Sequence, residues 1–150
     1  NFHKWYGLKY EIIYFNNVYG PKQIENHKMS AVIGIFENCV KKNLSLPVVK
    51  PGIQKRNFIH VNDAVSACIH AFKKNSNKQY NVSFKRSYRI IDIAKSFKKK
   101  IKLVKLRNGE QFKVTKISRV RGQKIINLNA KIDLKNYIKK FLVNEKKIHS

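Results

Sequence analysis

The sequence lacks the features that mark membrane, metal-binding and disulfide-linked proteins. No apolar run approaches the roughly 20 residues that a membrane-spanning helix needs. Cysteine occurs only at Cys39 and Cys68. Both fall in apolar helical patterns, so we expect two reduced thiols in the core of a cytoplasmic protein rather than a disulfide. No Cys/His group has the spacing of metal ligands, and no Gly-x-Ser-x-Gly motif occurs, which argues against a metalloenzyme or a serine hydrolase.

Acidic side chains are also scarce. Aspartate and glutamate number 8 against 33 lysines and arginines, which gives a formal net charge of +25. A large positive charge is typical of proteins that bind nucleic acid. Here the positive residues are mostly lysine and are spread along the whole chain. Lysine, isoleucine and asparagine are all abundant together, as a biased codon supply would produce. We therefore expect the charge to attract a small phosphorylated substrate, with a nucleic-acid-binding or scaffold protein as the alternative.

Apolar residues recur with alternating strand and helix periods, which predicts an α/β fold. Strands are predicted at 10–15, 46–49, 57–61, 79–83 and 101–106, and helices at 30–42, 64–74, 90–100 and 134–143. Residues 1–7 have the pattern of a helix end, and 112–117 is predicted to form a hairpin with 124–128. In the helix at 64–74, the apolar spacing predicts four inward side chains, which are Val65, Cys68, Ile69 and Phe72.

Two asparagines follow the first predicted strand. An apolar run leads into Asn16 and Asn17, and Gly20-Pro21 ends the segment. Ligands of open α/β sheets bind just past the carboxyl ends of strands. We therefore expect these asparagines at the mouth of a site, although loop asparagines also cap turns.

Five motifs occur in the order and spacing of a known family. They are Asn17-Val18-Tyr19-Gly20-Pro21, Leu46-Pro47-Val48 with Gly52 and Gln54-Lys55-Arg56, Asn57-Phe58-Ile59-His60-Val61-Asn62-Asp63, Tyr80-Asn81-Val82, and Arg107-x-Gly109-Glu110. Across about residues 6–110 the chain resembles the C-terminal half of the NAD-dependent epimerase/dehydratase family, the extended branch of the short-chain dehydrogenases/reductases. Among its subgroups it is most similar to the UDP-glucose 4-epimerase-like proteins.

The resemblance implies a binding site for a nucleotide sugar. Arg56 and Arg107 match the two arginines that hold the diphosphate, a role that suits planar guanidinium groups. Asn17 matches the asparagine beside the nicotinamide and the sugar phosphate. Asn16 precedes it on the same strand end, and both asparagines are expected to contact the cofactor. Val48 matches the position that packs near the nucleotide base, and a plain core position is an equally good interpretation.

Two further residues of the third motif look catalytic in isolation. His60 lies between apolar residues in a predicted strand, so we interpret it as structural. Asp63 is expected to cap the following helix and to orient the loop that carries Arg56. Neither is predicted to act as an acid or a base.

The resemblance also implies how the chain is organised. Residues 1–21 would end a Rossmann-like cofactor domain, 22–143 would form a small α/β nucleotide-sugar-binding domain, and 144–150 would be a fraying tail. Because the chain begins with asparagine rather than methionine, we expect it to belong to a longer protein.

The family's catalytic motifs are absent. Neither Gly-x-x-Gly-x-x-Gly nor Tyr-x-x-x-Lys occurs, so we expect no catalytic residue and no metal ligand here, and no activity from the chain alone. The intact protein is expected to be a cytoplasmic homodimer with bound NAD. It would oxidise the sugar at C4 and reduce it again from the other face.

Departures from the family pattern leave alternatives open. Asn57 and Asn62 replace aspartates, Tyr14 stands where arginine is usual, and Lys50-Pro51 fills a glycine-acidic pair. These changes weaken the case for a tightly ordered loop. Within the family, the alternative is a nucleotide-sugar 4,6-dehydratase. A further alternative is a decayed gene product that folds but has no activity.

Overall fold

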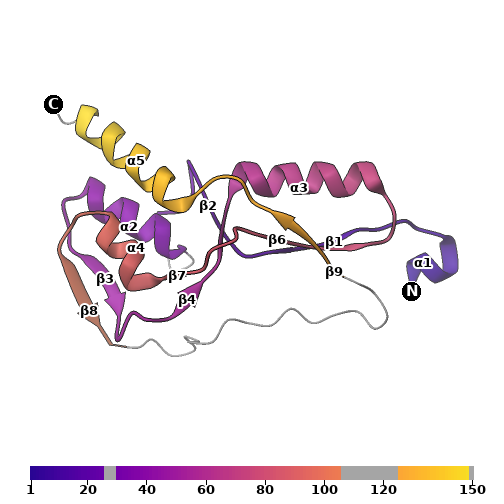
Figure 1. The fold of residues 1–150 in the computed structure, drawn as a ribbon, viewed down its shortest axis with the longest axis horizontal. Helices are drawn as coiled ribbons and strands as arrows, with labels where there is room; N and C mark the ends of the chain where they lie inside the picture. The colour runs from indigo at the N-terminus through magenta and orange to yellow at the C-terminus, as the bar shows by residue number, and fades with distance from the viewer. Residues whose placement is uncertain (26–29, 106–124, 149–150) are drawn as a thin grey trace.

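The computed structural model describes residues 1–25, 30–105 and 125–148. It is elongated and has two lobes (Figure 1). One lobe is a parallel sheet with a long helix along it, and a short helix, α1 (Phe2–Tyr6), lies at its far end. The other lobe packs three helices against short strands. The α/β class predicted from the sequence is confirmed.

The sheet lobe is built from three parallel strands. They lie in the order β1 (Ile12–Phe15), β6 (Gln79–Ser83) and β9 (Ile125–Asn129). The register pairs Ile13 with Tyr80 and Tyr80 with Ile126, which aligns β-branched and aromatic residues across the sheet. Helix α3 (Val61–Lys74) packs on β1 and β6 through three alanines, Ala64, Ala67 and Ala71.

The chain changes strand partners at Asn16. Immediately after this residue it continues as β2 (Asn17–Tyr19), which pairs in parallel with β5 (Phe58–His60) rather than with β6. Gly20 then brings the backbone against the start of α3. Its φ is +154°, and a Cβ at this position would lie 2.6 Å from Cγ1 of Val61. The glycine of the Asn-Val-Tyr-Gly-Pro motif is therefore required by close packing as well as by its backbone conformation.

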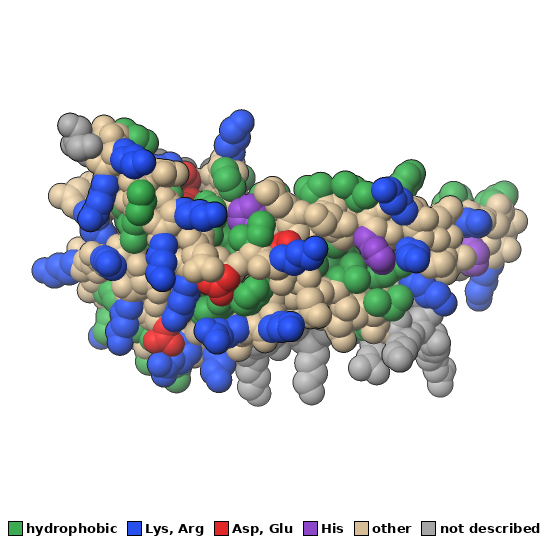
Figure 2. All heavy atoms as spheres, turned by 45° about the horizontal axis from the view of Figure 1, so that its top comes forward, with side chains coloured by type: hydrophobic (Ala, Val, Ile, Leu, Met, Phe, Trp, Pro, Cys, Tyr) green, Lys and Arg blue, Asp and Glu red, His purple; other side chains and the backbone are tan. Residues whose placement is uncertain are grey.

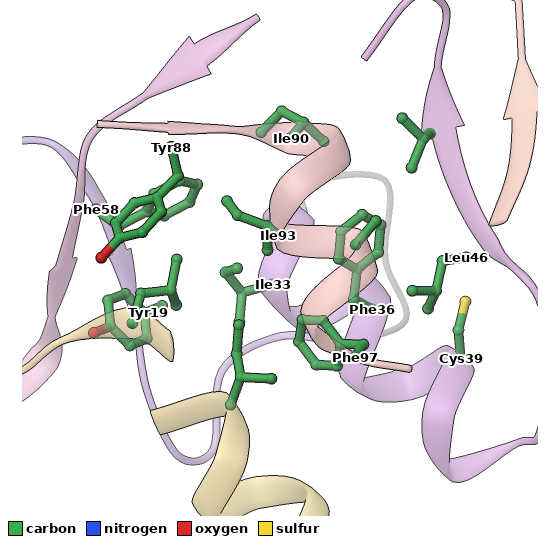
Figure 3. Close-up of a cluster of buried hydrophobic side chains, with 14 residues drawn as sticks. Tyr19, Ile33, Phe36, Cys39, Leu46, Phe58, Tyr88, Ile90, Ile93 and Phe97 are labelled. Atoms are coloured by element: carbon green, nitrogen blue, oxygen red, sulfur yellow. The ribbon is translucent and has the colours of Figure 1, made fainter. Parts of the chain in front are cut away.

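The second lobe surrounds the larger hydrophobic core. Its elements are α2 (Val32–Lys41), β3 (Leu46–Val49), β4 (Lys55–Arg56), β7 (Tyr88–Arg89), α4 (Ile90–Ser96), β8 (Ile101–Val104) and α5 (Leu134–Ile148). Strands β3 and β8 pair in parallel, and β4 and β7 pair antiparallel. Figure 3 shows the core, where Phe36 and Phe97 meet edge to face at 5.6 Å with Ile33, Ile93 and Leu46 around them.

The prediction for the core-facing side chains of α3 is wrong. Val65, Ile69 and Phe72 are 51%, 50% and 83% exposed, and Cys68 is exposed as well. The alanine face lies on the sheet instead, because small side chains let the helix approach the strands closely. Cys39 is buried as predicted, and both thiols are free.

Other boundaries differ by a few residues. Helix α3 starts at Val61 and is capped by His60, whose Nδ1 accepts a hydrogen bond from the amide of Asn62 (3.2 Å). Helix α5 continues to Ile148, beyond its predicted end at Val143. Residues 112–117 lie outside the described residues, and the predicted strand at 124–128 is β9, which pairs with β6. The domain boundary at residue 21 stays a prediction, and the structure places β1 in one sheet with β6 and β9.

Candidate functional site

The two predicted asparagines have different environments. The Asn16 amide Nδ2 donates to the backbone carbonyl of Val82 at 2.9 Å, so this side chain holds the strand break against β6. Asn17 is exposed, and its Nδ2 donates to the carbonyl of Asn57 at 2.8 Å. No hydrogen-bond partner of the Asn17 Oδ1 occurs within residues 1–25, 30–105 and 125–148. Asn17 is thus the more exposed of the two asparagines, and within the described residues its side-chain oxygen can accept from a ligand.

The β2–β5 pairing brings Asn17 beside Arg56, 39 positions along the chain. Asn17 pairs with Phe58 in the register, and both its backbone N–H and its side chain donate to the carbonyl of Asn57, the residue after Arg56. Arg56 is half-buried on β4, and its guanidinium donates to the carbonyl of Lys55 at 3.3 Å. Two of the four predicted substrate residues are therefore neighbours in space.

The other two predicted residues are not placed in this site. Val48 is fully buried in the larger core, where its Cγ1 lies 2.8 Å from the position that a Cβ on Gly52 would occupy. Gly52 has φ +75°, so the motif glycine allows both this turn and the contact with Val48. Arg107 lies outside the described residues, and its role stays a prediction.

A cationic hollow lies on the other side of β4. Its volume is about 600 Å³, and its lining comes from β4, β7, α4, α5 and the residues before β7. The lining includes Lys55, Arg86, Lys95 and Lys135, with Arg89 paired to Asp92 at 2.7 Å. Successive residues of a strand point to opposite faces, so Arg56 points away from the hollow that Lys55 lines. The hollow is a second region of positive charge, separate from the Asn17–Arg56 pair.

His60 is a structural residue, as the sequence indicates. It is 6% exposed and meets Tyr19 and Tyr137 edge to face at 5.3 and 5.5 Å. Burial lowers the pKa of its imidazole, and its Nδ1 is occupied as an acceptor at the start of α3. The imidazole ring therefore caps α3 and packs against Tyr19 and Tyr137.

The prediction for Asp63 is wrong. Its Oδ2 accepts the backbone N–H groups of Lys131 and Ile132 at 3.0 and 2.9 Å, so it anchors the segment between β9 and α5 rather than the Arg56 loop. The sequence predicts Asp63 as the cap of its own helix, because carboxylates at a helix start commonly accept from its first amides. The cap is His60, and the carboxylate reaches across the fold to the segment 68 positions along the chain.

A buried carboxylate that the sequence analysis did not single out lies in the second lobe. Glu37 on α2 is 3% exposed and accepts from Gln23 Nε2 (2.7 Å) and from the Tyr137 hydroxyl (2.8 Å). Burial raises the pKa of Glu37, and the two hydrogen bonds offset only part of that rise. In the sequence, Glu37 lies on a helix face that is otherwise apolar, and this position could have indicated a buried carboxylate.

The described part of the chain offers no complete site for a metal ion, and the sequence lacks the motif that binds a dinucleotide. Among residues 1–25, 30–105 and 125–148, no group of three or more His, Cys, Asp or Glu side chains could hold a metal ion. The glycine-rich fingerprint that cradles a dinucleotide pyrophosphate is absent from the sequence, so the residues present do not fit NAD by themselves. Within the same ranges, every helix is too short or too polar to cross a bilayer.

The sequence is similar to enzymes that act on nucleotide sugars. The model of the NAD dependent epimerase/dehydratase family matches residues 1–83. A putative UDP-glucose 4-epimerase from Methanocaldococcus jannaschii is 34% identical over 70 residues, which is 47% of this chain and 23% of that protein. UDP-glucuronic acid decarboxylase 3 from Arabidopsis thaliana is 27% identical over 101 residues, which is 67% of this chain and 29% of that protein.

A solved structure extends the likeness to the whole chain. UDP-glucose 4-epimerase from Thermotoga maritima, determined with UDP-glucose, superposes with a TM-score of 0.75 at 22% identity, over 99% of this chain and 50% of that one. At this identity the likeness shows the fold, and it confirms the predicted extended short-chain dehydrogenase/reductase class. The chain spans less than a third of the two curated relatives and half of the Thermotoga chain.

Proposed function

The chain belongs to the NAD dependent epimerase/dehydratase family, and on that premise we propose that it is the nucleotide-sugar-binding portion of a nucleotide-sugar epimerase. Asn17 and Arg56 hold the ligand, with Arg107 as a second arginine on the diphosphate. In the intact protein, NAD supplies the transient oxidation and re-reduction of the sugar at C4. The residues of this chain carry no step of that chemistry, because they lack the glycine-rich fingerprint and do not fit NAD by themselves.

The observation that carries the proposal is the contact between Asn17 and the carbonyl of Asn57. This contact places the exposed Asn17 amide, whose oxygen has no partner among the described residues, beside the half-buried Arg56 of the Gln-x-Arg motif. A diphosphate suits such a pair, because guanidinium groups bind phosphate oxygens bidentately and an amide oxygen can accept from a ribose or sugar hydroxyl. The net charge of +25 adds long-range attraction for a dianionic ligand.

The sugar and the reaction are finer parts of the proposal. The Methanocaldococcus relative is named as an epimerase, and the Arabidopsis relative is named as a decarboxylase of UDP-glucuronic acid. Both names specify a UDP-sugar, so we take UDP-sugars as the ligand class and UDP-glucose as the first ligand to test. The nucleotide-sugar 4,6-dehydratase stays the alternative within the family. The two free thiols suit a reducing compartment such as the cytoplasm, and we expect the intact protein to be a homodimer.

The assignment of Arg56 can be tested by calorimetric titration of the chain with UDP-glucose. Arg56→Ala should weaken binding by about 10- to 100-fold, because it removes a charge-assisted hydrogen bond to phosphate. Arg86→Ala is the matched control, since it removes the same charge from the hollow on the other side of β4. It should change the affinity by less than about threefold. A larger effect from Arg86 than from Arg56 would move the diphosphate to the hollow and overturn the assignment.

A further inference from the structure

The cationic hollow beside β4 brings together positive side chains from distant parts of the sequence. Lys55 lies on β4, Arg86 precedes β7, Lys95 lies on α4 and Lys135 lies on α5. Lys55 also pairs with Arg89 across the β4–β7 register, so both of these side chains lie on the same face of the strand pair. The fold therefore assembles a concentration of charge that no run of residues in the sequence indicates.

Carboxylates are too few to neutralise the cations of the hollow. Among the described residues that line it, five side chains are cationic and one, Asp92, is acidic. Both Asp92 oxygens accept from the Arg89 guanidinium, at 2.7 and 3.1 Å, so this carboxylate is already used. The other four cations make no salt bridge within residues 1–25, 30–105 and 125–148. Figure 2 shows lysine and arginine side chains outnumbering acidic ones over the visible face of this lobe.

Asp133, the carboxylate bonded to Tyr88 in the wall of the hollow, is also used within the fold. It accepts from the Tyr88 hydroxyl at 2.6 Å and from the Asn136 amide at 3.1 Å. A concave region lined by charges of one sign concentrates the electric field and attracts ions of the opposite sign. The positive charge of the hollow is therefore left to an anion from solution.

The lining suits phosphate groups rather than a nucleotide base. Tyr88 is the one aromatic residue among the described lining residues, and it is 4% exposed with its hydroxyl bonded to Asp133. It therefore offers little ring surface on which a base could stack. Guanidinium and ammonium groups instead donate charge-assisted hydrogen bonds to phosphate oxygens. A volume of about 600 Å³ lies within the range of small-molecule sites and leaves room for a chain of several phosphates.

We propose that the cationic hollow binds a short oligophosphate, such as tripolyphosphate or the phosphate chain of a nucleoside triphosphate. Its cations surround one hollow rather than following a groove, which favours a compact ligand over an extended polymer such as nucleic acid. Lys55 and Arg56 are neighbours on β4 and point to opposite faces. The oligophosphate therefore binds at the same time as a nucleotide sugar beside Asn17 and Arg56, and its site does not depend on the proposed function.

Calorimetric titration of the chain with sodium tripolyphosphate at physiological salt tests the site. We expect saturable binding of one tripolyphosphate per chain. Lys55→Gln combined with Lys95→Gln should weaken it by about tenfold, because two charged contacts are lost. Lys73→Gln combined with Lys74→Gln is the matched control, since it removes the same two charges from the end of α3 and should change the affinity by less than about threefold. All four lysines are exposed, so thermal unfolding of both double variants should match that of the parent chain.

A substitution that tightens binding separates recognition of the anion from damage to the fold. Asp92→Asn removes the one carboxylate of the described lining and releases the Arg89 guanidinium. Tripolyphosphate should then bind about threefold to tenfold more tightly, because a repulsive charge is replaced by an available donor. Glu145→Gln removes the same charge at the end of α5 far from Lys135 and should leave the affinity unchanged.

Parallel titrations identify the source of the phosphate chain. Equal affinities for tripolyphosphate and ATP would mean that the hollow recognises the phosphate chain alone. Tighter binding of ATP would make a nucleoside triphosphate the ligand. Both results support an oligophosphate site, whereas binding of ATP without any binding of tripolyphosphate would show recognition of the nucleoside and contradict the proposal.

Three further results would overturn the proposal. The first is equal weakening by the two double-lysine variants, which would mean diffuse attraction by the net charge of +25. The second is an Asp92→Asn variant that binds tripolyphosphate no more tightly than the parent. The third is displacement of tripolyphosphate by UDP-glucose, which would make the two sites one. Saturable tripolyphosphate binding in a chain that does not bind UDP-glucose would contradict the proposed function and leave the oligophosphate site standing.

Discussion

The Asn17 side-chain amide and the Asn57 backbone carbonyl lie 2.8 Å apart and join the starts of two parallel strands. This bond fixes the orientation of Asn17 and places it beside Arg56. It uses the carbonyl of residue 57 rather than its side chain. The replacement of the family's aspartate by Asn57 therefore leaves this particular connection intact.

The two asparagines should separate stability from binding. Asn16→Ala removes the bond to the Val82 carbonyl and should lower the free energy of unfolding by about 0.5–1.5 kcal/mol, with little change in affinity for UDP-glucose. Asn17→Ala should instead weaken binding by about fivefold or more. Urea unfolding and calorimetry on both variants check this. Equal effects of the two changes on affinity would contradict the distinction.

Gly20 should tolerate no larger side chain. Gly20→Ala places a Cβ 2.6 Å from Val61 Cγ1 at a φ of +154°, so we expect a loss of about 2–4 kcal/mol in the free energy of unfolding. Adding Val61→Ala removes the clash and should recover about 1 kcal/mol relative to the sum of the single changes. Strict additivity in a double-mutant cycle would show that backbone strain alone is responsible.

Asp133 should give stability that is lost in acid. Its carboxylate accepts from the Tyr88 hydroxyl (2.6 Å) and from the Asn136 amide (3.1 Å) at the start of α5. Burial alone would raise the pKa of Asp133, but these bonds outweigh burial and hold the pKa below its usual value. The stabilisation is therefore present above the ordinary carboxyl pKa and disappears as pH falls through the lowered one.

The test compares the stability of the parent chain with that of Asp133→Ser, which keeps a side chain able to cap α5 but removes the negative charge. At pH 7 the serine variant should be less stable by about 1–2 kcal/mol. The difference should shrink as the pH is lowered from 5 to 2. Thermal unfolding across this range checks the prediction, and a difference that is constant with pH would refute it.

Glu37 should have the opposite pH dependence. Its pKa is raised by burial, so its contribution to stability is greatest below the ordinary carboxyl pKa and is lost as pH rises through the raised one. Glu37→Gln should therefore match or exceed the parent in stability at pH 7 and lose that advantage near pH 4. The new amide can pair with the buried Gln23 Oε1, for which the described residues provide no partner.

Glu37→Leu is the contrasting variant. It leaves the Gln23 amide and the Tyr137 hydroxyl without their acceptor, which should cost about 2–4 kcal/mol. Chemical unfolding at pH 7 distinguishes the two changes. A glutamine variant as unstable as the leucine variant would mean that the ionised carboxylate itself stabilises the fold.

The sequence predicts the order of helices and strands because periodicity is a local property. It also brings Asn17 and Arg56 into one expected site through motif order. It misassigns α3, because the helical period shows which residues share a face but not which face meets the sheet. Small alanines permit close approach to the strands, and the larger apolar residues are left outside. The longest-range contacts, such as Asp63 with the amides of Lys131 and Ile132, have no local signal at all.

The central claim is that this basic chain recognises a nucleotide sugar rather than nucleic acid. Parallel titrations with UDP-glucose and with duplex DNA over a salt series test it most directly. The account predicts saturable binding of UDP-glucose that Arg56→Ala weakens, and DNA binding that is weak at physiological salt. Tight DNA binding with a steep salt slope and no effect of UDP-glucose would contradict it.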